Sequence, residues 1–254
     1  MAFGPVEFGP KLAEGKTKII YAHPESSNVV YMVHKDGITA GDGARRSTLE
    51  GKGKLACRTT SNVFYLLEDE GVATHYIGMV GEDVNIVTRC AMIPLEVVMR
   101  RIATGSFLRR NPDIAEGTRF APVLVEFFLK DDAQHDPLVT DGEIVSLGVA
   151  KQEEVEAMRE TGRKVFRILE EAWARQDVTL VDCKIEFGRA EDGKLLVADV
   201  IDNDSWRIWP GGDKARMLDK QIYRNMREVT EDSLAELLAK YEQVAELTDR
   251  FVED

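Results

Sequence analysis

The stretch that decides the fold is VDCKIEFGRAEDGKLLVADVIDNDSWRIWP, residues 181–210. Two runs rich in apolar and β-branched residues flank Asp192-Gly193, a dipeptide typical of two-residue β-turns. If Asp192 and Gly193 form the whole loop, Glu186 falls directly opposite Asp199 across an antiparallel pair. The sequence therefore predicts a hairpin that brings two carboxylates face to face.

The same hairpin supplies a candidate magnesium site. Opposed side chains have Cβ atoms roughly 5 Å apart, so two like charges there are destabilising unless a cation lies between them. Mg²⁺ often binds through one or two carboxylates plus substrate phosphates, which makes Glu186 and Asp199 its candidate ligands. The two-residue period of a strand puts Asp182 and Lys184 on the same face as Glu186, and it turns Val181, Cys183, Ile185 and Phe187 toward a core. A solvated strand face with a simple Lys–Glu pair would give the same pattern.

Acidic residues crowd the end of this stretch. Asp199, Asp202 and Asp204 precede Ser205 and Arg207 within nine residues. Turn formation and capping are ordinary uses of such residues, and they are the alternative to a role in the site.

A second cluster, RRIATGSFLRR at residues 100–110, predicts an anion site. Small residues at its centre let backbone N–H groups approach a phosphate, and the Ser106 hydroxyl adds a donor. Arginine makes bidentate contacts to phosphate or carboxylate. The four arginines cannot all point into one pocket, so some of them are expected on the surface, and a basic solvated loop is the alternative.

Three further segments combine glycine or acidic residues with bases: EGKTK (14–18), TAGDGAR (39–45) and LKDDAQHDP (129–137). EGKTK lacks the spacing of a P-loop, so a plain turn before a strand explains it equally well. TAGDGAR could be only a mobile loop. The chain has four histidines without an HxH or HxxxH pair, which argues against a metal–imidazole site.

The rest of the chain predicts an α+β fold with two lobes, because strands are grouped first and helices come later. Runs of β-branched and aromatic residues predict strands at 18–22, 28–35, 74–80, 84–90, 94–103 and 123–129. Apolar residues at helical spacing predict helices at 49–70, 151–175 and 231–252, the last with Thr230 as its N-cap. The expected boundary separates a β-rich lobe, residues 1–91, from a larger α+β lobe, residues 92–254.

Composition limits the class of protein. The formal net charge of −12 argues against nucleic acid as a main partner, since phosphate backbones require an extended basic surface. No apolar run approaches the ~20 residues of a membrane helix, and the N-terminus lacks the pattern of a signal peptide. Three scattered cysteines suggest neither a zinc site nor a disulfide framework. A cytoplasmic enzyme with small-molecule partners is expected.

Together these segments resemble the SAICAR synthetase family. The matching motifs are EGKTK, TAGDGAR, IPLEVVMRRIATGSFLRR, FFLKDDAQHDP, LVDCKIEFG, DVIDNDSWRIWP and DKQIYR, spread in the family's order over residues 12–224. LVDCKIEFG with DVIDNDSWR is the most specific combination. The resemblance implies an ATP cleft between two lobes, similar to that of protein kinases and ATP-grasp enzymes. It also implies a reaction of purine synthesis, in which ATP, carboxyaminoimidazole ribonucleotide and L-aspartate give the succinocarboxamide, ADP and phosphate.

The resemblance further implies roles for individual residues. Lys16 and Lys18 would lie over the ATP phosphates, Met92 would contact adenine through its backbone, and Glu186 and Asp199 would bind nucleotide and Mg²⁺. The residues implied for the ribonucleotide are Glu96, Arg100, Ser106 and Arg207, with the arginines and the serine on its phosphate. The candidates for shaping the aspartate region are Asp42, Arg45, Lys130 and Asp136. The catalytic candidates are Lys184 and Asp204, the latter to polarise or deprotonate a substrate amine.

This chemistry suits the residue types. A carboxylate is a poor electrophile, so phosphoryl transfer from ATP would convert it to an acyl phosphate that the aspartate amine attacks, and metal and lysines would offset the charge. No side-chain nucleophile is required, and the sequence offers no convincing Ser-His or Cys-His set. Two rivals remain: a small-molecule kinase with the same cleft, and a nucleotide-binding module without turnover, which the set Lys184, Glu186 and Asp199 disfavours. A homodimer is left open.

Overall fold

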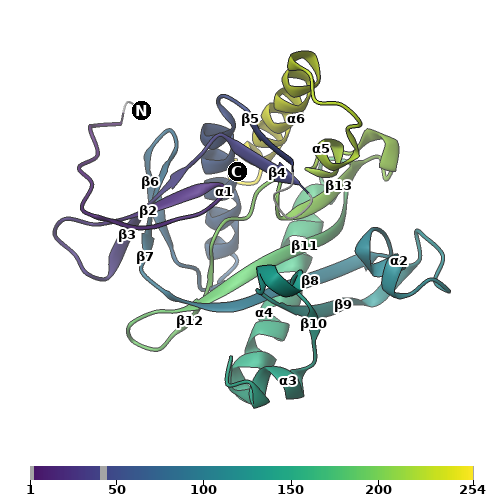
Figure 1. Cartoon of the computed structure of the whole chain (residues 1–254), viewed down its shortest axis with the longest axis horizontal. Helices are drawn as coiled ribbons and strands as arrows, with labels where there is room; N and C mark the ends of the chain where they lie inside the picture. Colours follow the sequence, from purple (N-terminus) through teal and green to yellow (C-terminus); the bar gives the residue numbers. More distant parts are fainter. Residues whose placement is uncertain (1–2, 41–44, 254) are drawn as a thin grey trace.

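The computed structural model describes residues 3–40 and 45–253 and arranges them around two antiparallel sheets (Figure 1). The first sheet has the strand order β1-β2-β3-β7-β6. Its strands are β1 (Lys11–Glu14), β2 (Lys18–Ala22), β3 (Val29–His34), β6 (Tyr76–Gly81) and β7 (Val84–Thr88). The strands β2, β3, β6 and β7 confirm the sequence prediction to within a few residues.

Helix α1 (Lys52–Asp69) packs against β3, β6 and β7 of this sheet. It follows a separate two-stranded ribbon of β4 (Gly37–Ala40) and β5 (Arg45–Thr48). The helix ends where Gly71 adopts a left-handed backbone, φ +68°, and donates its N–H to the Glu68 carbonyl. Glycine adopts this conformation without steric cost, which explains why the helix ends here, close to the predicted end at residue 70.

The second sheet has the order β10-β9-β8-β11-β12, and β13 also pairs with β11. Its strands are β8 (Ala91–Ile102), β9 (Arg119–Leu129), β10 (Leu138–Val139), β11 (Val178–Arg189), β12 (Leu195–Ala198) and β13 (Trp206–Pro210). The long strand β11 is central: β8 lies along one edge, and β12 and β13 share the other edge.

Helix α4 (Gln152–Ala174) covers one face of the second sheet and contacts β8, β9 and β11 (Figure 1). The apolar residues that predicted this helix are all buried: Val155, Met158, Val165, Phe166, Leu169 and Trp173. Helix α6 (Glu231–Asp249), capped by Thr230 as expected, packs along α1. The remaining helical segments are α2 (Ser106–Arg110), η1 (Asp132–Gln134), α3 (Asp141–Ser146), η2 (Lys214–Arg216) and α5 (Gln221–Asn225).

One hydrophobic cluster joins α1 to the second sheet and α4. Phe64 of α1 belongs to the same cluster as Ile185 of β11 and Phe166 of α4. The chain crosses from the first sheet to the second in the two residues after β7, and an isolated bridge pairs Thr74 with Val197. The α+β class is therefore confirmed, while a division into lobes at residue 91 stays a prediction.

The predicted register of the decisive hairpin is wrong by one residue. Glu186 pairs with Ala198 rather than with the residue after it. The physical reason is a three-residue loop: the N–H of Ala190 donates to the Lys194 carbonyl at 2.9 Å, and Gly193 takes a left-handed backbone with φ +83°. Three-residue hairpin loops of this kind place glycine in the left-handed position.

The predicted core face of β11 is confirmed for three of its four residues. Cys183, Ile185 and Phe187 belong to the large cluster described above. A register irregularity between Leu180 and Asp182 interrupts the alternation, so Val181 packs instead with Ile102 and Trp209. Bulges of this kind re-aim side chains locally. Among the described residues, no helix is long and apolar enough to cross a membrane.

Candidate active site

Two adjoining cavities lie beside β11 and the β7–β8 connection. One, called here the polar cavity, measures about 440 Å³ and is lined mainly by charged residues, some from β8, β11 and β13 and the others from several separate segments. The other, called the apolar cavity, measures about 460 Å³. Lys18, Lys130 and Asp199 line both, so the two cavities meet at a charged edge.

The apolar cavity has walls from both sheets. Its apolar lining residues include Ile20, Val30, Met32, Val87, Cys90, Met92, Ile93 and Pro94. Met92, predicted to contact adenine through its backbone, lies here with 45% of its surface exposed. Apolar walls with charged groups at one end suit a flat ring attached to an anionic chain.

Two lysines hold the carboxylate of Glu186. Lys184 and Lys130 each donate to it at 2.7 Å, and Lys184 also lies 3.4 Å from Glu96. Burial alone would raise the pKa of Glu186, but the two ammonium groups lower it to about 2. Burial likewise opposes the charge of Lys184, yet Glu186 and Glu96 raise its pKa above the ordinary value. The group is therefore ionised throughout the neutral range.

Asp199 reaches the same edge by a left-handed backbone, φ +67°, directly after β12. Its carboxylate forms an ion pair with Lys18 of β2. Burial lowers the pKa of Lys18 to about 8, although Glu186 acts in the opposite direction. The structure thus brings Glu186 and Asp199 to one edge, as predicted, but through a different register.

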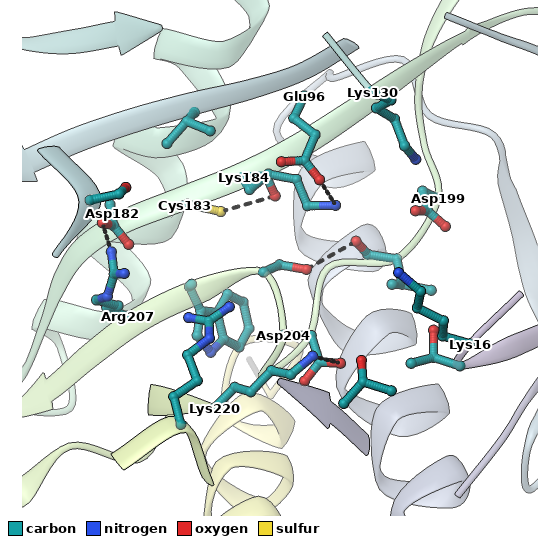
Figure 2. Close-up of a pocket in the computed structure, with 18 of the residues that line it drawn as sticks. Lys16, Glu96, Lys130, Asp182, Cys183, Lys184, Asp199, Asp204, Arg207 and Lys220 are labelled. Carbon is teal, nitrogen blue, oxygen red and sulfur yellow. Dashed lines mark hydrogen bonds and ion pairs between the residues drawn. The ribbon is translucent and has the colours of Figure 1, made fainter. Parts of the chain in front are cut away.

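Three opposed residues on β8, β11 and β13 form a charged row. Asp182 pairs in register with Arg100 on one side and with Arg207 on the other. Arg100 donates to Asp182 at 2.9 Å and to Glu126 at 2.6 Å, and Arg207 also donates to Asp182. The two arginines predicted to bind one phosphate therefore meet on a single carboxylate, at the end of the polar cavity away from Lys130 and Asp199 (Figure 2).

The turn before α2 is shaped to fit Arg207. Gly105 has φ +60°, and a Cβ atom there would lie 2.7 Å from Nη2 of Arg207. Any other residue would be strained and would push against the guanidinium group. The next residue, Ser106, begins α2 and lines the polar cavity, as does Glu96 of β8.

Asp204 is held by three donors. Lys220 lies 3.1 Å from its Oδ2, buried Lys52 lies 3.7 Å from the same atom, and the Tyr241 hydroxyl donates to Oδ1 at 3.1 Å. Burial would raise the pKa of Asp204, but the two lysines lower it to about 2. A carboxylate with so low a pKa is a weak proton acceptor, which argues against the predicted role as a base and favours an electrostatic one.

Of the residues expected to shape the aspartate region, the three that the structure describes do not come together at the cavities. Lys130 lines both cavities. Among the described residues, neither Arg45 nor Asp136 lines them: Arg45 donates to the carbonyls of Tyr223 and Met226 at 2.9 and 2.7 Å, and Asp136 accepts from the Asp131 N–H at 2.8 Å. Asp42 lies outside the described residues. Lys16 of EGKTK lines the polar cavity, and its contact with ATP phosphates stays a prediction.

Several residues of the site were not singled out by the sequence. Asp182 could have been, because it shares the strand face of Lys184 and Glu186. Thr39, Lys220 and Arg224 line the polar cavity from distant segments, and only DKQIYR as a matching motif hinted at the last two. Buried Lys52, the first residue of α1, carried no sequence signal, since lysines between glycines are typical of surface turns.

The donor set fits Mg²⁺ only together with a ligand. In the part of the chain that the structure describes, no group of three or more acidic, histidine or cysteine residues could hold a metal by itself. Glu186 supplies an ionised carboxylate and Asp199 a second carboxylate, and both line the apolar cavity. Two carboxylates completed by phosphate oxygens are a usual environment for Mg²⁺, so the residues present fit this ion.

Fold and site define a nucleotide-using enzyme whose second substrate is an anion. The sequence matches the SAICAR synthetase family over residues 11–240. It is 63% identical to the phosphoribosylaminoimidazole-succinocarboxamide synthase of Roseiflexus sp. (strain RS-1), over 97% of this chain and 99% of the relative. The corresponding synthase of Chloroflexus aggregans is also 63% identical, over 97% and 98% of the two chains.

Solved structures agree. The phosphoribosylaminoimidazole-succinocarboxamide synthase of Ehrlichia chaffeensis superimposes with a TM-score of 0.86 at 32% identity, over 96% of this chain and all of the other. A SAICAR synthetase solved in complex with ADP superimposes with a TM-score of 0.84 at 34% identity, over 93% and 96% of the two chains. The chain belongs to the SAICAR synthetase family, whose members are ATP-dependent ligases.

Proposed function

We propose that the two cavities form the active site for joining L-aspartate to carboxyaminoimidazole ribonucleotide with ATP. The nucleotide base occupies the apolar cavity, its phosphates lie at the shared edge, and the ribonucleotide occupies the polar cavity. The observation that carries this proposal is the shared edge, because Lys18, Lys130 and Asp199 line both cavities. A transferable phosphoryl group and an anionic acceptor would meet there.

The ribonucleotide has one orientation that matches the charges. Its phosphate binds Arg207, Arg100 and Ser106, so its carboxylate points along the polar cavity toward Lys184 (Figure 2). Glu96 accepts from the imidazole amine. Arginine suits the phosphate end because its guanidinium group makes bidentate contacts. Lysines such as Lys184 suit the carboxylate end of the ribonucleotide, since negative charge develops there during phosphoryl transfer.

Glu186 and Asp199 would hold Mg²⁺ together with the nucleotide phosphates. Bound there, Mg²⁺ would supply positive charge that offsets the phosphate charge during phosphoryl transfer. Lys16 and Lys18 bind the phosphates from the first sheet, and Lys184 keeps the carboxylate of Glu186 ionised and oriented. Lys18 now contacts the carboxylate of Asp199, and Lys130 that of Glu186. When nucleotide binds, each lysine would contact a phosphate instead of its carboxylate, or in addition to it.

The chemistry then needs no covalent enzyme intermediate. The substrate carboxylate attacks the γ-phosphorus of ATP, which releases ADP and forms an acyl phosphate. The aspartate amine attacks the acyl carbon, phosphate leaves with one former carboxylate oxygen, and the amine loses a proton. Lys220 and Arg224 line the polar cavity and are available for the carboxylates of aspartate, with Lys130 at the other end. Asp204 keeps Lys220 in place.

Phosphate release tests the proposal directly. Purified protein with ATP, Mg²⁺ and the ribonucleotide should release phosphate rapidly only when L-aspartate is added. A small-molecule kinase would form a stable phosphorylated product without aspartate, and a binding module would show no turnover. Either result would contradict the proposed ligase reaction.

An isotope experiment tests the activation step. Ribonucleotide labelled with oxygen-18 in its carboxylate should transfer one labelled oxygen to the released phosphate, because phosphate departs from the acyl carbon. Unlabelled phosphate, with amide product still formed, would mean that ATP hydrolysis drives the reaction by another route.

Two expectations about the surroundings of the enzyme stay predictions, a cytoplasmic location and no nucleic-acid partner, and a homodimer stays open. The net charge of −12 supports the second. Light scattering after size-exclusion chromatography would decide between a monomer and a dimer.

A further inference from the structure

The backbone of Asp199 is unusual for a residue with a side chain. Its φ of +67° lies in the left-handed region, which residues other than glycine adopt rarely and at a cost in free energy. Such a conformation persists only where neighbouring groups hold it. The structure therefore has to contain contacts that fix this backbone.

The left-handed turn determines where the carboxylate points. Ala198 lies opposite Glu186 and shares its face of the sheet, whereas Val197 points into the core. Continued alternation would turn the side chain of Asp199, two residues after Val197, to the core face as well. The turn at Asp199 breaks the alternation, and its carboxylate reaches Lys18 instead.

His75 contacts this turn directly. Its Nε2 lies 3.0 Å from the Asp199 carbonyl oxygen. A carbonyl oxygen only accepts hydrogen bonds, so Nε2 carries the proton and donates. Burial, with the charge of Lys18, lowers the pKa of His75 to about 3, and the ring is therefore neutral with its one proton on Nε2.

The position of His75 is itself fixed from both sheets. Its N–H donates to the Val197 carbonyl at 2.9 Å, and its carbonyl accepts from the Thr88 N–H at 2.6 Å. The ring packs edge-on against Phe64, with centroids 5.3 Å apart, and only 4% of the residue is exposed. A side chain so constrained can hold a neighbouring backbone group rigidly.

We propose that His75 is a positioning residue: its Nε2–H holds the carbonyl of Asp199, fixes the left-handed turn and thereby aims the carboxylate at the nucleotide phosphates. The inference rests on the proposed function, because it assumes that Asp199 acts on the nucleotide. His75 would thus contribute to nucleotide binding through the backbone carbonyl of Asp199, without touching the reacting groups itself.

A simpler role for His75 predicts different results. The residue also lines the apolar cavity, so it could support the nucleotide base merely as part of the wall. In that case its replacement would weaken nucleotide binding whether or not Asp199 has a carboxylate. If His75 acts through Asp199, the effect requires that carboxylate.

A double-mutant cycle separates the two roles. Binding of ADP with Mg²⁺ is measured by titration calorimetry for the unmodified protein, H75L, D199N and the double variant H75L/D199N. Asparagine tolerates a left-handed backbone, so D199N removes the charge and keeps the turn. Loss of an outer-shell partner typically costs about ten- to a hundred-fold, so H75L should weaken binding by about ten-fold alone and by less than about two-fold in the D199N background.

A second pair of variants covers the case in which H75L does not fold. Glutamine extends an amide N–H to the reach of Nε2, whereas asparagine reaches only as far as Nδ1. H75Q should therefore bind ADP with Mg²⁺ nearly as well as the unmodified protein, and H75N should bind it about ten-fold more weakly. Circular dichroism and thermal unfolding verify that each variant is folded.

The outcomes are distinguishable. Equal losses from H75L in both backgrounds, or unchanged binding in H75L and H75N, would overturn the positioning role while leaving the role of Asp199 intact. Unchanged binding in D199N would instead overturn the proposed contact of Asp199 with the nucleotide. Weak binding in H75L and H75N, with recovery in H75Q and no added loss in the double variant, would support the inference.

Discussion

At the scale of single residues, the principal cations of the site lie beside carboxylates. Lys18 pairs with Asp199, Lys184 with Glu186, and Arg207 with Asp182. Buried pairs of this kind contribute little net stability, yet removing one partner is costly because it leaves an uncompensated charge. The effect of a substitution in the site therefore includes the cost of the partner charge that it leaves unpaired.

The two arginines of the charged row should respond differently to truncation. R207A removes one phosphate contact, so the KM for the ribonucleotide should rise by the equivalent of roughly 1.5–3 kcal/mol, about ten- to a hundred-fold, while the KM for ATP stays unchanged. R100A removes buried contacts to Glu126 and Asp182, which keep Arg110 and Arg207 as partners, so its unfolding free energy should fall by about 1.5–3 kcal/mol.

Steady-state kinetics on R207A and urea unfolding of both variants measure these effects. Equal increases of the two KM values in R207A would contradict the assignment of Arg207 to the ribonucleotide phosphate.

Lys18 should give nucleotide binding a characteristic pH dependence. Burial lowers its pKa to about 8, and bound phosphates would raise it again. Below about pH 8 the ammonium is already charged, so affinity for ADP should be constant. Above that pH the protein must take up a proton to bind, and affinity should fall by up to about ten-fold per pH unit.

Titration calorimetry between about pH 7 and 9.5 measures this decline in affinity. The matched variant K18M should bind more weakly but with a flat profile in this range. A decline of the same slope in K18M would assign the titration to another group.

At the scale of elements, the periodicity of apolar residues predicted those helices and strands whose pattern is set by the local sequence. The helices α1, α4 and α6 and the strands β2, β3, β7, β8 and β9 were predicted because each repeats its apolar residues over several turns or pleats. The strands β1, β4, β5 and β10 and the short helices α2, α3 and α5 were missed. They have two to six residues and lack a clear apolar repeat, so little in the sequence indicated them.

In the hairpin, the two carboxylates come together as predicted, but the predicted strand register is wrong. Asp192-Gly193 correctly indicated the loop, but the sequence could not distinguish a two-residue from a three-residue connection. Glu186 and Asp199 still converge, because a left-handed residue compensates for the shifted register. The ion-pair partners of Asp182 and Asp204 come from distant segments and left no local signal.

The start of α4 offers a test of one such long-range contact. Arg189 of β11 donates to Glu154 through Nε at 2.5 Å and Nη2 at 2.8 Å, and Glu154 also accepts from the Lys151 N–H. The hydrogen bond from Arg189 lowers the pKa of Glu154 from 4.5 to about 2, although burial opposes it. Because the folded-state pKa is depressed, the stabilisation is present above pH 4.5 and is lost as the pH falls toward 2.

E154Q should therefore lower the free energy of unfolding by about 1 kcal/mol at neutral pH, and the difference from the unmodified protein should shrink below pH 4.5. Urea unfolding at several pH values measures the difference. The neighbouring exposed residue supplies a control, since E153Q should leave stability unchanged. A pH-independent loss in E154Q would mean that charge is not the cause.

At the scale of the whole molecule, the continuous core matters more than the two sheets. The cluster that contains Phe64, Phe166 and Ile185 ties α1 to α4 and the second sheet, and His75 bonds to strands of both sheets. The apolar cavity also takes its walls from both sheets. The two halves of the chain are therefore unlike independent domains, which would have separate cores.

We expect a single cooperative unfolding transition in differential scanning calorimetry. Saturating ADP with Mg²⁺ should shift the whole transition upward, by about 2.7 kcal/mol of stability at a concentration one hundred times the Kd. Two resolved transitions, with only one of them shifted by the nucleotide, would instead support a division near residue 91 into separately folding lobes.

The three thiols differ in burial, so one cysteine of the native chain can be labelled selectively. Cys57 and Cys183 are completely buried, and burial raises the pKa of the Cys57 thiol to about 12. Cys90 is partly exposed in the wall of the apolar cavity. A maleimide added to the folded protein should therefore react first with Cys90, in the wall of the cavity proposed to hold the nucleotide base. Without any engineered residue, the rate of alkylation there becomes a measure of cavity occupancy, suited to screening compounds that compete with ATP.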